Sequence, residues 1–181
     1  MGTGEEPSSA RPRRIAVVGT ASGCGKTTLA RALARTLDAS FVELDALVHG
    51  PGWVETPDDV LRAKVAPLLE QERWVVDGHY RAKLGDVVLS RADLVVWLDL
   101  PVHVWLPRLA WRTVKRGVTR EELWNGNRES LRAAVWGKDS LLGYALRTYR
   151  RRRAELPGVL ARYPYVRLAS PGEVRRFLRR V

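Results

Sequence analysis

The stretch that decides the fold reads IAVVGTASGCGKTTLARAL and covers residues 15–33. Its first four residues form a short apolar run that ends at a glycine, which is typical of a strand buried on both faces of a parallel sheet. From Lys26 to Leu37 leucines recur along one stripe, which predicts a helix. A glycine-rich loop joins the two elements. The chain therefore begins its fold with a strand, a glycine loop and a helix.

The glycine loop has the chemistry of a phosphate-binding site, because a glycine-rich turn that opens a helix offers backbone N–H groups to an anion. The pattern predicts that the Lys26 ammonium binds the β and γ phosphates of ATP and that the Thr27 hydroxyl binds Mg²⁺. The usual spacing G-x-x-x-x-G-K-[ST] puts its first glycine at position 20, where this chain has Thr20, and Gly19 stands one residue early. A glycine turn without nucleotide is the alternative. The predicted nucleotide-binding residues of the loop are Gly19, Ser22, Gly23, Cys24, Gly25, Lys26, Thr27 and Thr28.

The rest of the chain alternates between short apolar runs, which are typical of buried strands, and stretches with the periodicity of a helix. Apolar runs predict further strands at residues 41–44, 74–76, 94–98 and 165–168. Helices are predicted at residues 57–71, after Pro101 and from Glu173 onward. This alternation predicts an α/β fold with a parallel sheet and right-handed crossovers. Residues 1–13 are predicted to be a disordered tail with a basic end, and residues 14–181 a single domain.

Composition narrows the class of protein. With 181 residues of which 45% are hydrophobic, the chain has the size of one domain with a real core. The lone Cys24 cannot form an internal disulfide, which fits a reducing compartment. No apolar run approaches the roughly 20 residues of a transmembrane helix, and the first ten residues do not resemble a signal peptide. We therefore expect a cytoplasmic protein with no membrane partner.

The net charge of +11 lies in the second half of the chain. Residues 101–181 hold 19 Lys and Arg against 6 Asp and Glu, whereas residues 1–100 hold 12 against 14. A surface this basic attracts polyanions, whether nucleotide phosphates, an acidic substrate or nucleic acid. Charge alone does not choose among these partners.

Two carboxylates stand at the ends of predicted strands. Asp77 ends the strand at 74–76, where a carboxylate usually supports a phosphate-bound Mg²⁺, so Thr27 and Asp77 are the predicted metal-binding residues. The alternative for Asp77 is an ordinary Asp-Gly turn. Asp45 follows the strand at 41–44 and is predicted to orient or deprotonate an acceptor hydroxyl. The alternative for Asp45 is a helix N-cap.

Several of these features together resemble adenylate kinase and its relatives. The shared features are the phosphate loop, the segment Asp77-Gly78-His79-Tyr80-Arg81, and the strand that ends in Asp99-Leu100-Pro101. Within that group Asp45, residues 51–53, Asp77-Gly78-x-Tyr80 and residues 124–128 are similar to a branch labelled "DNA topology modulation protein" or adenylate-kinase-related kinase. The resemblance covers roughly residues 14 to 180.

The resemblance implies a three-layer P-loop NTPase fold with helices on both faces of a five-stranded parallel sheet in the order 2-3-1-4-5. It further implies an acceptor-binding region at about 45–72 and a helical lid at about 113–148. In adenylate kinases an arginine pair at the spacing of Arg108 and Arg112 contacts the base and the donor phosphates, although a solvated basic face is the alternative here. Arg81 is implied to grip a phosphate. Arg128, with Arg147 as a second candidate, is implied to reach the γ-phosphate when the lid closes.

The acceptor side departs from adenylate kinases. They carry a threonine and an arginine for AMP shortly after the position of Asp45, whereas residues 46–50 here read ALVHG. His49, Trp53, His79 and Tyr80 instead suggest a pocket for a smaller or more apolar acceptor. The predicted function is a phosphotransferase that moves the γ-phosphoryl group of Mg-ATP to a small molecule or nucleotide, with Lys26, Asp77, Asp45, Arg81, Arg112 and Arg128 as catalytic residues. The alternative is a nucleotide-dependent DNA- or RNA-binding regulator that uses the basic half.

Overall fold

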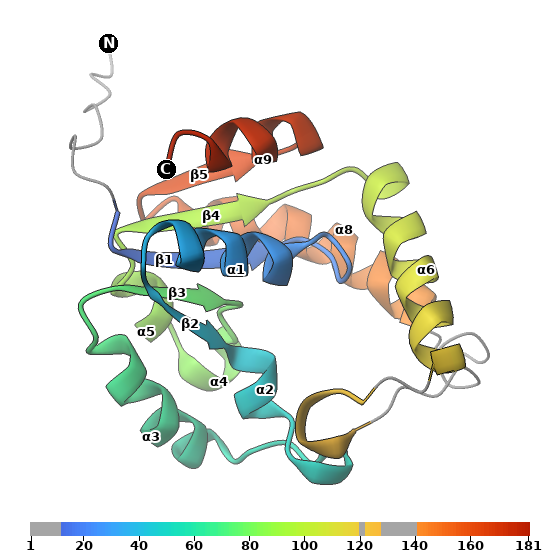
Figure 1. Ribbon diagram of the computed structural model, residues 1–181, viewed down its shortest axis with the longest axis horizontal. Helices are drawn as coiled ribbons and strands as arrows, with labels where there is room; N and C mark the ends of the chain where they lie inside the picture. Colours follow the sequence, from blue (N-terminus) through green and yellow to red (C-terminus); the bar gives the residue numbers. More distant parts are fainter. Residues whose placement is uncertain (1–11, 120–121, 128–140) are drawn as a thin grey trace.

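The protein is built around one parallel sheet, shown in the computed structural model of Figure 1, which describes residues 12–119, 122–127 and 141–181. Its strands are β1 (Arg14–Gly19), β2 (Ser40–Glu43), β3 (Trp74–Asp77), β4 (Leu94–Leu98) and β5 (Tyr165–Leu168). They lie in the order β2-β3-β1-β4-β5, and every neighbouring pair is parallel. The predicted α/β fold and strand order are confirmed.

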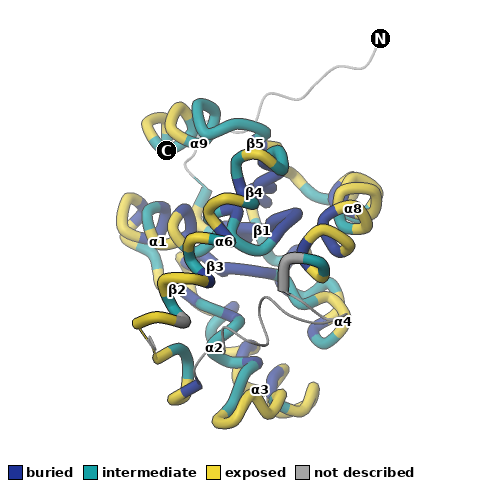
Figure 2. Tube along the Cα trace, turned by 90° about the vertical axis from the view of Figure 1, so that its right-hand side faces the viewer, coloured by how far each residue is buried: buried dark blue, intermediate teal, exposed yellow. Residues whose placement is uncertain are grey.

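Helices cover both faces of the sheet. The longer ones are α1 (Lys26–Thr36), α3 (Asp58–Leu69), α6 (Val102–Thr119), α8 (Leu141–Leu160) and α9 (Pro171–Leu178). The shorter ones are α2 (Leu44–Val48), α4 (Arg81–Leu84), α5 (Val87–Ser90) and the single turns η1 (Pro51–Trp53) and η2 (Trp124–Gly126). Helices α1 and α9 pack on one face, whereas α3, α5 and the end of α8 pack on the other. Figure 2 shows α1 and α8 on opposite sides of the central strands.

The central strand β1 explains why its apolar run is continuous. Ile15 and Val17 pack into the core cluster under α1, whereas Ala16 and Val18 pack into the cluster on the opposite face. All four side chains are fully buried. Burying a valine or isoleucine stabilises a fold by about 1.5–3 kcal/mol, so both faces of this strand hold the phosphate loop in place.

The last helix begins earlier than its sequence pattern predicts. α9 starts at Pro171, two residues before the predicted Glu173, because Ser170 and Glu173 form a capping box. The Ser170 hydroxyl accepts a hydrogen bond from the Glu173 N–H at 3.2 Å, and the Glu173 carboxylate accepts one from the Ala169 N–H at 2.8 Å. Proline is well suited to the first helical position that this cap creates.

The segment predicted as a lid is divided between three parts of the chain. Its beginning is the end of α6, its last residues are the start of α8, and residues 122–127 form a turn around η2. Arg128 and the rest of the segment lie outside the described residues, so the lid stays a prediction. None of the described helices is both long and apolar enough to cross a membrane.

Candidate active site

The loop between β1 and α1 depends on glycine at two residues. Gly23 and Gly25 have φ angles of 76° and 96°, a left-handed region that side chains disfavour. A Cβ on Gly23 would also lie 2.9 Å from the Cβ of Leu109 in α6. The main chain of the loop therefore packs directly against α6 at Gly23.

Gly19 serves a different purpose, although the usual spacing places it one residue early. A Cβ on this residue would lie 2.6 Å from Cδ of Lys26 and 2.7 Å from Sγ of Cys24. Lys26 can therefore bend back over the end of β1 only because Gly19 has no side chain. This contact accounts for a glycine at position 19.

Asp77 lies beside the loop because β3 pairs with β1, with Asp77 opposite Val17. Its carboxylate accepts a hydrogen bond from the Thr27 hydroxyl at 2.5 Å and lies 3.6 Å from the Lys26 ammonium. The carboxylate thus contacts the phosphate loop rather than its own turn, where Gly78 instead bonds to the Val17 carbonyl. The structure brings together the three residues that the sequence predicted for phosphate and metal.

The charge of Asp77 is only partly compensated. Its side chain is 2% exposed, and burial raises the pKa of its carboxyl even though Lys26 and Thr27 act in the opposite direction. Burial alone would lower the pKa of Lys26, but the charges of Asp77, Cys24 and Asp45 raise it above its ordinary value. Lys26 therefore stays protonated at the loop. Its positive charge does not fully offset the cost of burying the Asp77 carboxylate beside it.

These observations fit Mg²⁺. The buried Oδ1 of Asp77 has no hydrogen-bond partner among the described residues, so it can accept one from a metal-bound water or bind the metal. In the same part of the chain no group of three His, Cys, Asp or Glu could hold a metal by itself. A Mg²⁺ here would need the phosphates of a nucleotide as further ligands, which is how this ion is usually bound.

A single cleft runs from the phosphate loop to α6, α9 and η2. Its volume is about 1660 Å³, which exceeds the roughly 300–1,000 Å³ of a pocket for one small ligand. The predicted residues that line the cleft are Ser22, Gly23, Cys24, Gly25, Lys26, Thr27, Thr28, Asp45, Arg108 and Arg112. Arg108 and Arg112 therefore face this space from α6, across from Val174 and Leu178 of α9.

Asp45 lines the same cleft from the first turn of α2, and it is near enough to Lys26 and Asp77 for its charge to act on both. The N-cap of that helix is Glu43, so the alternative of an N-cap at Asp45 is wrong. Asp45 instead accepts a hydrogen bond from the Tyr80 hydroxyl at 2.5 Å. Burial and the charge of Asp45 raise the pKa of Tyr80, which keeps the phenol protonated as a donor.

Two asparagines of the η2 turn, Asn125 and Asn127, form hydrogen bonds to the main chain of residues 46–53. We call this arrangement the asparagine clasp. The Asn127 amide donates to the Gly50 carbonyl and accepts from the Trp53 N–H, both at 2.9 Å. Asn125 donates to the His49 carbonyl at 2.5 Å. Asn127 is 4% exposed. The clasp joins the two motifs that carried the finer resemblance, residues 51–53 and 124–127.

Aromatic rings accompany the clasp. The His49 ring lies 5.6 Å from the Trp53 ring and stacks with the Trp124 ring at 6.2 Å. Trp53 and Trp124 both line the cleft. Trp53 has a φ of 60°, which is rare for a bulky residue, so the clasp holds this tryptophan in a strained position.

The predicted arginines are placed less uniformly. Arg81 opens α4 and forms an ion pair with Asp86, so its guanidinium is engaged away from the phosphate loop. Arg147 is exposed on α8, and Arg128 lies outside the described residues. Neither Arg81 nor Arg147 is among the residues that line the cleft.

One arginine near the site, Arg152, is not among the residues that the sequence predicts for it. Burial chiefly, and then the charge of Arg152, lower the pKa of His79 to about 4. The same charge acts on Lys26 and Tyr80, so Arg152 of α8 lies near these two groups, although it is not among the residues that line the cleft. Nothing in a run of four arginines indicates which one lies near the site. Only the position of α8 against the sheet decides it.

Comparisons with known proteins agree with this geometry. The model of the family "ATPase family associated with various cellular activities (AAA)" matches residues 16–71, which include the phosphate loop. No curated protein sequence matches the chain.

Solved structures match over nearly the whole chain. The shikimate kinase of Acinetobacter baumannii, solved with shikimate, has a TM-score of 0.60 at 19% identity and covers 93% of this chain and 89% of its own. The shikimate kinase of Bacteroides thetaiotaomicron has a TM-score of 0.58 at 17% identity, with 94% and 96% covered. A gluconokinase from Sinorhizobium meliloti 1021 has a TM-score of 0.50 at 25% identity, with 93% of each chain covered. The chain thus has the P-loop kinase fold that shikimate kinase has.

Proposed function

We propose that this protein is a Mg-ATP-dependent phosphotransferase that acts on a small acceptor bearing a hydroxyl group. The observation that carries the proposal is the arrangement of Lys26, Thr27 and Asp77 at the phosphate loop, with Asp45 lining the same cleft as Lys26 and Thr27. The first group has the chemistry to bind the donor phosphates, and the second has the chemistry to receive a proton. The likeness of the fold to small-molecule kinases supports the same conclusion at a general level.

The residues divide the reaction between them. The loop N–H groups and Lys26 hold the phosphates, and Arg108 and Arg112 contact the nucleotide from α6. Thr27 and Asp77 would hold Mg²⁺ together with the phosphates, and the ion would supply positive charge to the phosphate oxygens. The acceptor oxygen attacks the γ-phosphorus while the bond from that phosphorus to the β–γ bridging oxygen breaks, and ADP leaves. Asp45, oriented by Tyr80, takes the proton of the acceptor hydroxyl.

Arginines from elsewhere complete the charge balance. We propose that Arg152 stabilises the negative charge that develops on the transferred group, because its charge already acts on Lys26. Arg128 keeps its proposed role at the γ-phosphate from the lid. For Arg81 the ion pair with Asp86 favours a role in placing α4, and phosphate binding would require that pair to open.

The acceptor itself is defined by class. The AMP-binding threonine and arginine of adenylate kinases have no counterpart at residues 46–50, whereas Trp53 and Trp124 give the acceptor end two aromatic surfaces. These features favour a compact polyol, sugar or nucleoside over AMP. The asparagine clasp supports the resemblance to the adenylate-kinase-related branch, since it uses the residues that define that resemblance.

The test is ADP formation by the purified protein with Mg-ATP and a panel of sugars, polyols, nucleosides and nucleoside monophosphates. We expect one acceptor class to raise turnover, and Lys26→Ala to reduce that turnover by about 1,000-fold because the phosphate charge loses its partner. Lys64→Ala, at an exposed position of α3, is the matched control. Turnover that survives in Lys26→Ala would refute the assignment of the loop.

The regulator alternative rests on the charge of the second half alone. It predicts binding to duplex DNA with an affinity that falls steeply as the salt concentration rises. If ATP binds, no acceptor raises turnover, and DNA binds in this salt-dependent way, the alternative replaces the kinase.

A further inference from the structure

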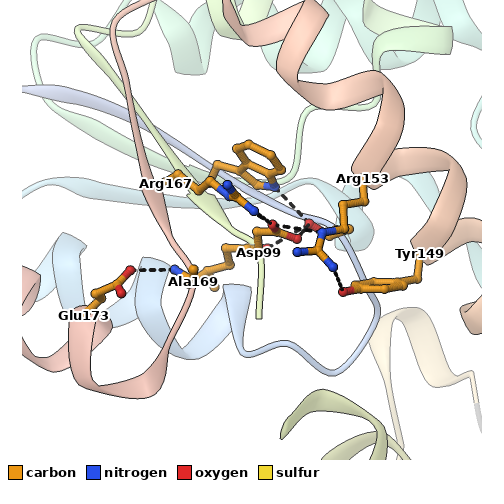
Figure 3. A network of polar contacts seen from close by, with 9 residues as sticks. Asp99, Tyr149, Arg153, Arg167, Ala169 and Glu173 are labelled. Atoms are coloured by element: carbon orange, nitrogen blue, oxygen red, sulfur yellow. Dashed lines mark hydrogen bonds and ion pairs between the residues drawn. The ribbon is translucent and has the colours of Figure 1, made fainter. Parts of the chain in front are cut away.

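A buried carboxylate outside the cleft holds the start of the phosphate loop. Asp99 follows β4, and its side chain is completely shielded from solvent. Its Oδ1 accepts a hydrogen bond from the Thr20 hydroxyl at 3.0 Å. Its Oδ2 accepts from Nε of Arg167 at 3.0 Å and from Nη2 of the same guanidinium, and lies 3.3 Å from Nε of Arg153 (Figure 3).

The surroundings of Asp99 compensate the charge of its carboxylate. Burial of a carboxylate is unfavourable unless other groups compensate it, and two guanidinium groups do so here. Each guanidinium is itself placed by an aromatic ring, since Arg167 lies over the Trp97 ring at 4.9 Å and Arg153 over the Tyr149 ring at 5.7 Å. Arg153 also donates to the Tyr149 hydroxyl at 2.9 Å. The network therefore joins β4, β5 and α8 at one point.

The remaining partner of Asp99 is Thr20, which occupies the position of the first glycine in the usual phosphate-loop spacing. The Thr20 hydroxyl accepts a hydrogen bond from the Trp97 indole N–H at 2.9 Å while it donates to Asp99. The Thr20 N–H bonds to the Leu98 carbonyl at 3.0 Å. Thr20 is 1% exposed. A glycine at this position could keep the main-chain bond but not the two that the hydroxyl makes.

We propose that Thr20 and Asp99 are positioning residues for the phosphate loop. In this chain, where Thr20 stands at the position of the usual first glycine, the hydrogen bond between Thr20 and Asp99 fixes the start of the loop. Neither residue lines the cleft, so they act through the loop and not on the nucleotide itself. The same carboxylate holds Arg153 of α8, so the start of the loop and α8 share one anchor. The inference rests on the proposed role of the loop in binding nucleotide.

The proposal makes an unusual prediction. Thr20→Gly restores the common spacing G-x-x-x-x-G-K-[ST], yet it should weaken nucleotide binding, because Asp99 and Trp97 lose their partner. Thr20→Val, which keeps the shape without the hydroxyl, should do the same. Thr20→Ser keeps the hydroxyl and is the matched control.

The measurement is the Kd of Mg-ATP by titration calorimetry, at a temperature where each variant is folded by its melting curve. We expect Thr20→Gly and Thr20→Val to raise the Kd about tenfold and Thr20→Ser to leave it within about twofold, as the loss of a buried hydrogen bond to a charged group implies. Equal Kd values for Thr20→Val and Thr20→Ser, with a lower melting temperature for the first, would overturn the proposal, since the network would then serve stability alone.

A second variant tests the proposal without a substitution at the buried Thr20, which could disturb folding. Arg167 is half-exposed, so Arg167→Gln loosens Asp99 without opening the core, and it should raise the Kd of Mg-ATP by about threefold. No change in this variant would also overturn the proposal. Because the readout is binding, failure to find an acceptor for the wild-type protein would refute the kinase assignment and leave this test intact. A wild-type protein that does not bind Mg-ATP would refute both.

Discussion

The two parts of the site, which we call its donor end and its acceptor end, are held in place by different means. The donor end, around the phosphate loop, is fixed by the buried residues 15–19 of β1 and 74–77 of β3, and by the buried carboxylate of Asp77. The acceptor end, at residues 44–53 and 79–80, is held by the asparagine clasp and by the hydrogen bond from Tyr80 to Asp45. Both Trp53 and Tyr80 have left-handed φ angles there. Under the proposed function, donor binding would depend on the core, whereas acceptor specificity would depend on loops attached to it.

The donor end can be disabled without a change in shape by Asp77→Asn. We expect turnover to fall by about 100-fold and the magnesium concentration for half-maximal rate to rise, because the amide is a poor partner for a metal ion. Asp59→Asn, at an exposed position of α3, is the control. Steady-state rates across a magnesium titration measure both effects, and an unchanged magnesium dependence would remove Asp77 from the metal site.

His79 lies in the turn after β3, next to Tyr80, and its titration tests how well this turn is shielded from water. The folded-state pKa of about 4 lies below the ordinary value of 6.5, so the folded protein excludes the proton that the unfolded chain takes up. This residue therefore contributes stability that is present above pH 6.5 and is lost as the pH falls toward 4.

The loss amounts to roughly 2–3 kcal/mol of unfolding free energy. His79→Asn should flatten the dependence of the unfolding free energy on pH over this range, as measured by urea denaturation at several pH values. His103→Asn, at an exposed position, should leave that dependence unchanged. A curve for His79→Asn that falls as steeply as the wild-type curve would contradict the burial of this ring.

Asn127→Ala releases the acceptor loop while leaving the donor end intact. We expect the KM for the acceptor to rise about tenfold and the Kd of Mg-ATP to stay within about twofold, because the loop loses two hydrogen bonds that position it. Gln71→Ala, an exposed amide, is the matched control. Equal losses for ATP and acceptor would show that the two ends are not independent.

Tyr80→Phe makes the smallest change, the removal of one hydroxyl. The rate constant kcat should fall about threefold, because Asp45 loses the donor that orients it. Tyr165→Phe, at an exposed position on the edge strand, should have no effect. A pH–rate profile for the acceptor reaction would show whether the proton-accepting group has also changed.

The same contrast explains what the sequence predicts well. Strands such as β1 and β4 are continuous apolar runs, and a run of this kind has few alternatives to a buried parallel strand. The phosphate loop and Asp77 follow from local spacing and from strand ends. Fold and donor end are therefore predictable from short stretches of chain.

The acceptor end is not predictable in this way. Asn127 reaches the main chain of residues about 75 positions earlier, and a side chain bound to a distant carbonyl leaves no periodic pattern. The ion pair between Arg81 and Asp86 and the position of Arg152 near His79 likewise depend on where helices pack in the fold. The predicted start of α9 missed a capping box that was visible in the sequence as Ser170 and Glu173.

The asparagine clasp has a consequence for how the protein can change over generations. Among the described residues, the Asn127 side chain bonds to main-chain atoms of Gly50 and Trp53, so it recognises the course of that loop and not its side chains. Mutation can therefore exchange the chemical groups that the loop shows to an acceptor while the loop keeps its place. If the proposed function holds, such a scaffold could acquire a new substrate by single substitutions in this loop and keep its ATP-binding residues unaltered.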